Sequence, residues 1–349
     1  MIAIAAAAAG LHHAIAEAHV LDGLLKFCAA FFGIWWAWMN YTWFASAYDN
    51  DDTPYRLLTL LIMAGSLTMA AGISQLFERN DLLLIVIGYV IMRLGMVALW
   101  LRAARHDPDR RSTALWYAAG IALVQLYWVA LMVAQPTQPA AFYGLFALGA
   151  ILEMAVPALA ERRATTPWHR HHIIERYGLL NIIVLGETLL AGSMALSQAV
   201  GEHFDMALLH LALSSLVILF SMWWLYFSAE EHLQEQSLSR ALTWGYGHII
   251  IFMSGAAVGT GFAVLVDIVT GHADLGLLAG DYAVAIPVAV YLLGLWFVRD
   301  RFVLRGAARH VLPLFAGLIL LTPPLLALEG VALMTTISVW VRSRLANTR

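Results

Sequence analysis

Apolar residues occur along this chain in long continuous runs, separated by short segments that contain charged residues or proline. Most runs reach about 18 residues or more, the length that an α-helix needs to cross the hydrocarbon core of a bilayer. The runs do not alternate in polarity as the strands of a membrane barrel do. The pattern therefore predicts about twelve helices, near residues 2–19, 24–46, 56–77, 81–102, 112–134, 140–160, 168–199, 206–229, 242–268, 281–299, 308–327 and 329–345.

Composition supports a membrane protein. Hydrophobic residues make up 61% of the chain and charged residues 12%, whereas soluble domains have roughly 45–50% and 25%. So few charges could not cover the surface of a soluble fold of this length. We expect an all-α, polytopic transmembrane helical bundle that forms a single integral membrane domain over residues 1–349. Its main partner is the lipid bilayer.

Charge and cysteine content exclude other classes of protein. The formal net charge is -3, and no basic run indicates nucleic-acid binding. The single cysteine, Cys28, allows no intramolecular disulfide. The N-terminal stretch lacks the basic region of a signal peptide.

Loop charges predict the orientation, because Lys and Arg accumulate in cytoplasmic loops. The basic connections, at residues 102–111, 161–176 and 299–309, follow every second helix, and the C-terminal tail is also basic. The connections at residues 135–140, 200–205 and 267–281 contain no Lys or Arg. Both termini and the segment of residues 49–52 are therefore expected in the cytoplasm.

An internal repeat is indicated by two tryptophan pairs. Trp35-Trp36 and Trp223-Trp224 are each followed by aromatic residues and an acidic exit, which is Glu230-Glu231 in the second copy. The next helices continue in a similar register. We expect two parallel six-helix repeats, with halves of about 1–165 and 166–349, related by an axis along the membrane normal. Chance similarity between apolar helices is the alternative.

Two motifs carry a resemblance to a known family. WWAWMNYTWFASAYDNDD, followed by YR, and TPWHRHHIIERYGLLNIIVLGE resemble the bacterial low temperature requirement A (LtrA) family. The resemblance covers essentially the whole chain. It implies a many-helix protein of the bacterial cytoplasmic membrane linked to stress tolerance, with no established biochemical activity. Family members usually start with L-E-L-F-F-D, which is absent here, and the repeat register also indicates a shortened first helix.

Charged side chains inside a bilayer are functional candidates. Arg93 lies mid-helix, where a charge costs at least about 2.5–3.5 kcal/mol and needs a partner. Glu187 is the expected partner because adjacent glycines would let another helix approach; Glu153 and Glu17 are alternatives. The pair either fixes helix packing or belongs to a substrate or proton pathway.

Two polar residues also lie at membrane depth. His248 and Asn40 are expected to form interhelical hydrogen bonds. A proton relay through His248 is the alternative, because imidazole titrates near neutral pH.

The second motif is expected at the membrane interface. Thr166-Pro167 predicts a helix start, so the interfacial motif comprises Trp168, His169, His172, Glu175 and Arg176. Contact with lipid headgroups is favoured, and a metal site at the two histidines is the alternative. We assign no metal and no cofactor.

The acidic cluster consists of Asp49, Asp51 and Asp52. Several carboxylates could hold a divalent cation, but Asp52-Thr53-Pro54 also predicts a turn into a helix, which is the favoured interpretation. The neighbouring tryptophans are interpreted mainly as packing, with a ring-lined ligand cavity as the alternative.

These features favour a secondary-transport or permeation role for a small molecule or ion, with buried Arg and Glu at the repeat interface. One alternative is an intramembrane or lipid-handling enzyme at the cytoplasmic face, which would use the acidic cluster and the interfacial motif. Another is a non-catalytic, stress-related membrane protein. No motif points directly to catalysis, so an enzyme is the less favoured class.

Overall fold

The computed structural model describes residues 2–199, 206–228 and 238–347, and within these ranges it contains helices and no strand. The first half comprises α1 (Ile2–Ala16), α2 (Val20–Tyr48), α3 (Thr53–Arg79), α4 (Leu83–His106), α5 (Arg111–Ala134) and α6 (Pro139–Ala160). The second half begins with α7 (Arg170–Ala199), α8 (Met206–Phe227), α9 (Leu238–Val269) and α10 (Leu277–Leu295). It continues with a π-helical turn η1 (Trp296–Asp300), α11 (Arg301–Val303), the 3₁₀ turn η2 (Gly306–His310), α12 (Val311–Leu321) and α13 (Pro323–Asn347).

The predicted fold class is confirmed. Within the described ranges, nine helices are long and apolar enough to cross a membrane, and α1 and Gly306–Leu321 are shorter apolar segments. Large apolar side chains are exposed along these helices, as expected where the helix surface faces lipid. The protein is a polytopic, all-α membrane protein.

The C-terminal helices differ in their boundaries from the prediction. The expected helix 308–327 ends at Leu321, because Pro323 and Pro324 follow and lack the N–H groups that would continue it. The break expected near residue 328 is present inside α13, where Ala327 adopts φ 48° and ψ −145°. The acidic exit at Glu230-Glu231 lies outside the described residues.

The chain forms two compact units. One comprises essentially residues 25–176, and the other residues 3–24 together with 177–349. We call them the α2–α6 unit and the α7–α13 unit. The single-domain organisation and the repeat halves at 1–165 and 166–349 stay predictions.

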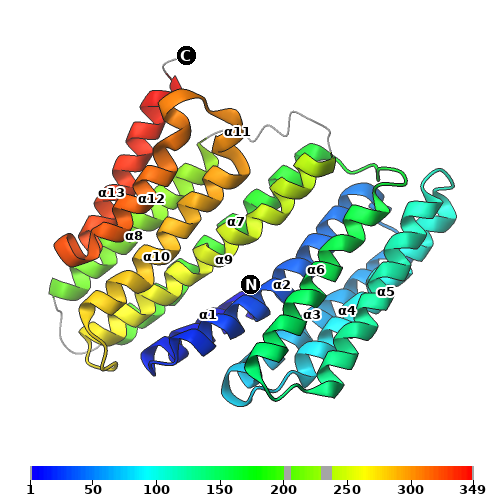
Figure 1. The fold of residues 1–349 in the computed structure, drawn as a ribbon, viewed down its shortest axis with the longest axis horizontal. Helices are drawn as coiled ribbons and strands as arrows, with labels where there is room; N and C mark the ends of the chain where they lie inside the picture. Colours follow the sequence, from blue (N-terminus) through cyan, green and yellow to red (C-terminus); the bar gives the residue numbers. More distant parts are fainter. Residues whose placement is uncertain (1, 200–205, 229–237, 348–349) are drawn as a thin grey trace. The chain divides into compact units, whose positions relative to one another are not determined.

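The α2–α6 unit is an antiparallel bundle in which α3 packs on α4, α4 on α5 and α5 on α6 (Figure 1), while Tyr41 of α2 bonds the hydroxyls of Tyr55 and Thr59 on α3. Helices α3 and α4 lie especially close, because glycines leave their backbones uncovered: a Cβ at Gly88 would lie 2.4 Å from the Met69 nitrogen. A Cβ at Gly65 would likewise lie 2.7 Å from the Gly88 oxygen. Short loops and small residues therefore bring α4 against α3 on one side and α5 on the other.

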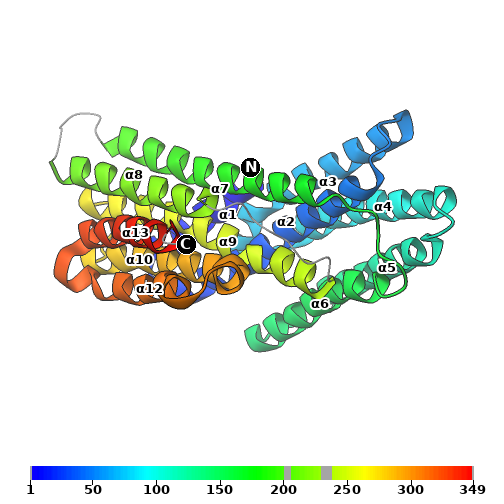
Figure 2. The same cartoon turned by 90° about the horizontal axis from the view of Figure 1, so that it is seen from above.

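In the α7–α13 unit, α9 packs on α10, α10 on α12, α12 on α13, and α13 returns to α8 (Figure 2). Here too glycine permits close contact, since a Cβ at Gly261 would lie 2.4 Å from the Ala283 oxygen. Helix α1 joins α9 through two polar contacts. Thr260 donates to the Ala8 carbonyl at 3.1 Å, and His12 Nε2 lies 2.7 Å from an Asp267 oxygen.

Candidate functional site

The α2–α6 unit contains a buried ion pair in the middle of its helices. Arg93 on α4 and Glu153 on α6 each expose only 2% of the side chain, and Arg93 Nη2 lies 3.3 Å from Glu153 Oε1. A buried pair of this kind costs several kcal/mol per ion in lost hydration, which the attraction between the charges offsets only when further hydrogen bonds are made. Here such bonds are present.

Three uncharged aromatic groups also donate to Glu153. The indole of Trp36 donates to Oε2 at 2.8 Å, while the Tyr89 hydroxyl and the Trp128 indole donate to Oε1 at 2.9 and 3.1 Å. Arg93 in turn donates to the Tyr89 hydroxyl and lies 4.4 Å above its ring. Every group that faces the carboxylate is a donor, so the arrangement suits its ionised, acceptor-only form.

Local sequence explains why these side chains meet. Tyr89 and Arg93 are four residues apart and share one face of α4. On α6, Gly149 leaves room for the Trp128 ring, since a Cβ there would lie 2.6 Å from it. The ring therefore lies flat enough against α6 for its N–H to reach Glu153, one turn further along.

Gln125 belongs to the same level of the bundle. Trp100 stacks on Tyr117 at 3.9 Å, and Tyr89 meets Trp128 at 6.5 Å between ring centres. These two contacts set the antiparallel register of α4 and α5, and in this register Gln125 falls at the level of Met92 and Arg93.

The Gln125 side chain is only 9% exposed, and the structure shows no partner for its amide within the described ranges. The same holds for Arg93 Nε. We call Trp36, Tyr89, Arg93, Gln125, Trp128 and Glu153 the polar layer.

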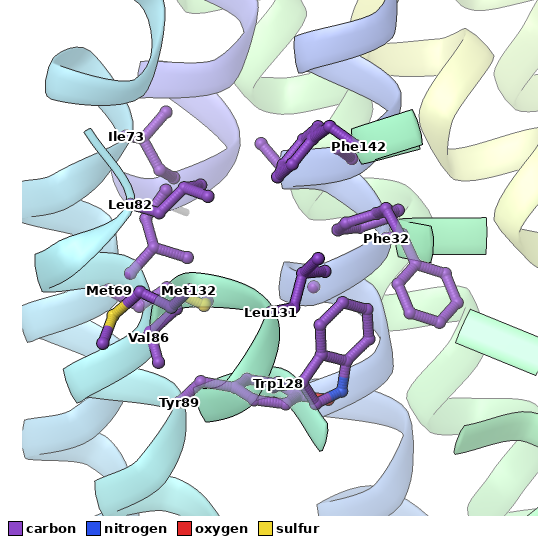
Figure 3. A pocket seen from close by; sticks show the side chains of 15 residues that line it. Phe32, Met69, Ile73, Leu82, Val86, Tyr89, Trp128, Leu131, Met132 and Phe142 are labelled. Carbon is purple, nitrogen blue, oxygen red and sulfur yellow. The ribbon is translucent and has the colours of Figure 1, made fainter. Parts of the chain in front are cut away.

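An apolar pocket adjoins the polar layer (Figure 3). It contains about 670 Å³ of empty space, part of it open to the surroundings, and exposes no polar surface. Tyr89 and Trp128 lie together at one end, and Phe32 and Phe142 line its side. All five helices of the unit contribute to the lining, which comprises Ala29, Ala30, Phe32, Gly33, Met69, Ile73, Leu82, Ile85, Val86, Tyr89, Trp128, Leu131, Met132, Phe142 and Phe146.

The expected partner of Arg93 was wrong. The structure pairs Arg93 with Glu153, the alternative, because α4 and α6 belong to the same compact unit and both flank α5. Glu187 lies on α7 and is half-buried, and Glu17 is exposed beyond the end of α1. Gln125 was not anticipated, although a glutamine within an apolar helix is a signal that the sequence carries.

The two other membrane-depth candidates bond within their own helices. Asn40 donates to the Trp36 carbonyl at 2.8 Å, and His248 Nδ1 lies 2.8 Å from the Trp244 carbonyl. Each of these contacts spans one helical turn. His248 is fully buried, with Tyr177 and Phe252 among the surrounding rings.

The interfacial motif is anchored on the end of α2. The His169 N–H donates to the Ser46 hydroxyl at 2.9 Å, and the Trp168 ring meets Trp43 at 5.0 Å. Helix α7 begins at Arg170, so Thr166 does not cap it as predicted. Thr166 instead donates from its N–H and its hydroxyl to the buried Glu161 carboxylate, at 2.9 and 2.7 Å.

The remaining motif residues face outward. His169 and His172 place their rings 5.4 Å apart, and both are exposed, as are Glu175 and Arg176. Within the described part of the chain, no group of three or more metal-binding side chains comes together.

The acidic cluster is engaged with arginines and a helix end. Asp52 caps α3 by accepting from the Tyr55 N–H at 3.0 Å and pairs with Arg102 of α4. The Arg102 hydrogen bond, together with the Tyr55 N–H, lowers the pKa of Asp52 to about 2. Asp51 pairs with Arg56 at 2.9 Å, and Asp49 is exposed. The capping interpretation is confirmed for Asp52.

A second buried charge cluster, formed by Arg299, Asp300 and Arg342, was not predicted from the sequence. Asp300 accepts from Arg299 Nε at 2.8 Å and from Arg342 Nε and Nη2 at 2.7 and 2.9 Å. Arg299 also donates to the Tyr226 and Leu225 carbonyls at the end of α8. Arg299 belongs to a basic connection and Arg342 to the basic C-terminal tail in the sequence, and both are at most 3% exposed.

Comparison with known proteins identifies the chain. It matches the family described as Bacterial low temperature requirement A protein (LtrA) over residues 1–342. The chain belongs to the LtrA family. A similar protein is "Uncharacterized protein RA0937" of Rhizobium meliloti (strain 1021), which is 28% identical over 264 residues, or 67% of this chain and 60% of that protein. The match thus spans less than two thirds of the relative's length. No solved structure matches the chain.

Proposed function

We propose that this LtrA-family protein has a secondary-transport or permeation role, in which a small molecule binds at the polar layer of the α2–α6 unit. One observation carries the proposal: a buried ion pair in the middle of the helices adjoins an apolar pocket, and polar groups at the same level have no partner in the described part of the chain. Ionisable residues within membrane helices commonly mark pathways or ligand sites. Apolar pockets with a few convergent polar groups are the usual form of small-molecule sites.

The energetics also favour a ligand site over a purely structural pair. Well-packed hydrophobic residues of similar size often stabilise a fold as well as a buried ion pair or better. The Gln125 amide and Arg93 Nε have no partner among the described residues. Each such buried group destabilises the fold by about 1–3 kcal/mol, and a pair that served only helix packing would not require this cost. A ligand that binds at the polar layer would explain both the buried ion pair and the polar groups left without partners.

A metal-dependent enzyme at the cytoplasmic face has less support. The carboxylates of Asp51 and Asp52 are paired with Arg56 and Arg102, which removes the free charge that a divalent cation would need. Asp52 also serves as a helix cap. The role in stress tolerance implied by the family name is compatible with transport.

The proposal includes a location in the bacterial cytoplasmic membrane with both termini cytoplasmic, on the basis of the loop charges.

The proposal also includes parallel repeats. Arg102 at the end of α4 bonds Asp52 beyond the end of α2, and Arg299 after α10 bonds the carbonyls that end α8. These arginines occupy matching positions in the sequence echo, which supports the repeat.

Flux measurements test the role. Purified protein in liposomes is mixed with small uncharged solutes (urea, acetamide and glycerol), and permeability is followed by stopped-flow light scattering, with a pH-sensitive dye reporting proton flux in parallel. We expect the wild type to raise permeability to at least one solute above that of empty liposomes. The double variant Arg93→Met/Glu153→Met should return permeability to the background, because the polar layer is lost while the volume is kept.

The double change is chosen because a single change would leave a buried charge unpaired and destabilise the unit by about 3–5 kcal/mol. A cooperative thermal unfolding transition shows that the double variant is folded. Wild-type permeability equal to that of empty liposomes for every solute and for protons would overturn the proposed role.

A further inference from the structure

Gln125 is the least explained side chain in the polar layer. Its carbonyl oxygen can accept two hydrogen bonds and its NH₂ group can donate two. None of these bonds is made to the described residues, and the residue is only 9% exposed. An amide left in this state costs about 1–3 kcal/mol. Arg93 Nε adds one unused donor at the same level.

The charge balance of the layer decides which ligand fits. Arg93 and Glu153 neutralise each other, so a charged ligand would bring an uncompensated charge into the membrane at a cost of several kcal/mol. The unused groups comprise donors and an acceptor. A ligand must therefore be uncharged and must both accept and donate hydrogen bonds, as a hydroxyl or a primary amide does.

The pocket decides what the rest of the ligand is. Gln125 precedes Trp128 by three residues on the buried face of α5, and Trp128 lies at one end of the pocket (Figure 3). The two levels are about one helical turn apart, roughly 5 Å. A short alkyl chain spans this distance, and the pocket exposes only apolar surface to receive it.

We propose that the polar layer binds small uncharged amphipathic molecules, namely short-chain alcohols or primary amides. The polar end bonds Gln125 and Arg93 Nε, and the alkyl chain lies in the pocket beyond Tyr89 and Trp128. This inference rests on the proposed function, because it names the class of molecule for the same site. It assigns to Gln125 the recognition of the polar end.

Photolabelling tests the assignment directly. A six-carbon primary alcohol that carries a diazirine in its chain is photolysed with the purified full-length protein, and labelled residues are located by mass spectrometry. Unlabelled hexanol and hexanamide serve as competitors. We expect the label on pocket residues such as Leu82, Val86 and Met132. The amide and the alcohol should protect them, whereas positively charged hexylamine should not.

Gln125→Leu should weaken protection by about tenfold, the effect of losing roughly 1.4 kcal/mol of hydrogen bonding. Its fold should be retained, because the change removes an unsatisfied buried amide. Gln125→Met, which keeps the unbranched shape, provides a second variant. Gln75→Leu, at a half-buried position of α3 away from the pocket lining, is the matched control and should protect like the wild type.

Three results would overturn the inference: equal labelling by a diazirine alkane without the hydroxyl, equal protection by hexylamine, or unchanged protection in both Gln125 variants. Labelling is independent of flux, so the two proposals fail separately. A labelled, Gln125-dependent site without solute flux would refute transport and leave the ligand class standing. Solute flux with no Gln125-dependent labelling would refute the ligand class alone.

Discussion

The two buried charge clusters differ in how completely their arginines are used. In the α7–α13 unit, every guanidinium nitrogen of Arg342 donates to Asp300 or Ser228. Arg299 likewise uses all three nitrogens, on Asp300 and on helix-end carbonyls. In the α2–α6 unit, Arg93 leaves Nε without a partner among the described residues, beside the unsatisfied Gln125 amide.

This difference indicates that the Asp300 cluster holds helices together, whereas the Arg93–Glu153 pair belongs to a candidate binding site. Carbonyls at a helix end need donors, so Arg299 completes α8 and links it to α10 and α13. The Arg93–Glu153 pair lies mid-helix, where backbone groups are already bonded, and adjoins a pocket. The first cluster stabilises the fold, while the second has capacity left for a ligand.

Removing Asp300 should have the largest effect on stability. Asp300→Ala leaves Arg299 and Arg342 buried without their shared carboxylate, and breaking a buried pair costs about 3–5 kcal/mol. Because two buried arginines lose their carboxylate, the loss should lie at the upper end of this range. Denaturant titration in detergent measures the free energy of unfolding. Asp274→Ala, outside this cluster, is the control. A loss below about 1 kcal/mol would show that the cluster does not fasten the helices.

The α2–α6 pair should respond differently to single and double changes. Glu153→Met alone should cost about 3–5 kcal/mol, because Arg93 stays buried and unpaired. Arg93→Met/Glu153→Met should recover part of that loss, because no charge stays buried and unpaired, although Trp36, Tyr89 and Trp128 lose their acceptor. Thermal unfolding midpoints of the two variants give the comparison. A double variant as unstable as the single one would mean that the pair, like the Asp300 cluster, is required for folding.

The half-buried Asp52–Arg102 pair should give the smallest effect on stability, and this effect should depend on pH. The pKa of Asp52 is lowered to about 2 from an ordinary value near 3.9. Its contribution to stability is therefore complete above about pH 4 and is lost as the pH falls towards 2. The unfolding midpoint of the wild type should exceed that of Asp52→Asn at pH 5, and the gap should close by pH 2.

Asp109→Asn, a change at an exposed position of a later loop, is the control for this series. A gap between wild type and Asp52→Asn that stays constant from pH 5 to pH 2 would contradict the assignment of the lowered pKa to the Arg102 and Tyr55 contacts.

Much of the architecture could be predicted along the chain. The apolar runs located the helices, and Asp52 with Pro54 marked the start of α3 correctly. The helix start predicted at Thr166-Pro167 was wrong. The Thr166 hydroxyl donates to Glu161, and the helix begins only at Arg170. The same local signal therefore acted as a cap in one place and as a loop anchor in another.

The candidate site was only partly predictable. Arg93 was recognised because an isolated charge in an apolar run is conspicuous, but its partner was misassigned to Glu187. Gln125 was overlooked, and Arg299 was taken for a loop residue although it is 1% exposed. Each of these errors concerned which side chains meet or are buried.

The sequence by itself determined that this chain is a bundle of membrane helices, because the transfer of a helix into lipid depends on a local sum over its own side chains. Only the tertiary structure decided that Glu153 neutralises Arg93, that Gln125 lies at the same level with no partner among the described residues, and that Asp300 joins two arginines. Pairing between charges and hydrogen-bonding groups depends on distances of about 3 Å between different helices, and helix packing alone sets those distances.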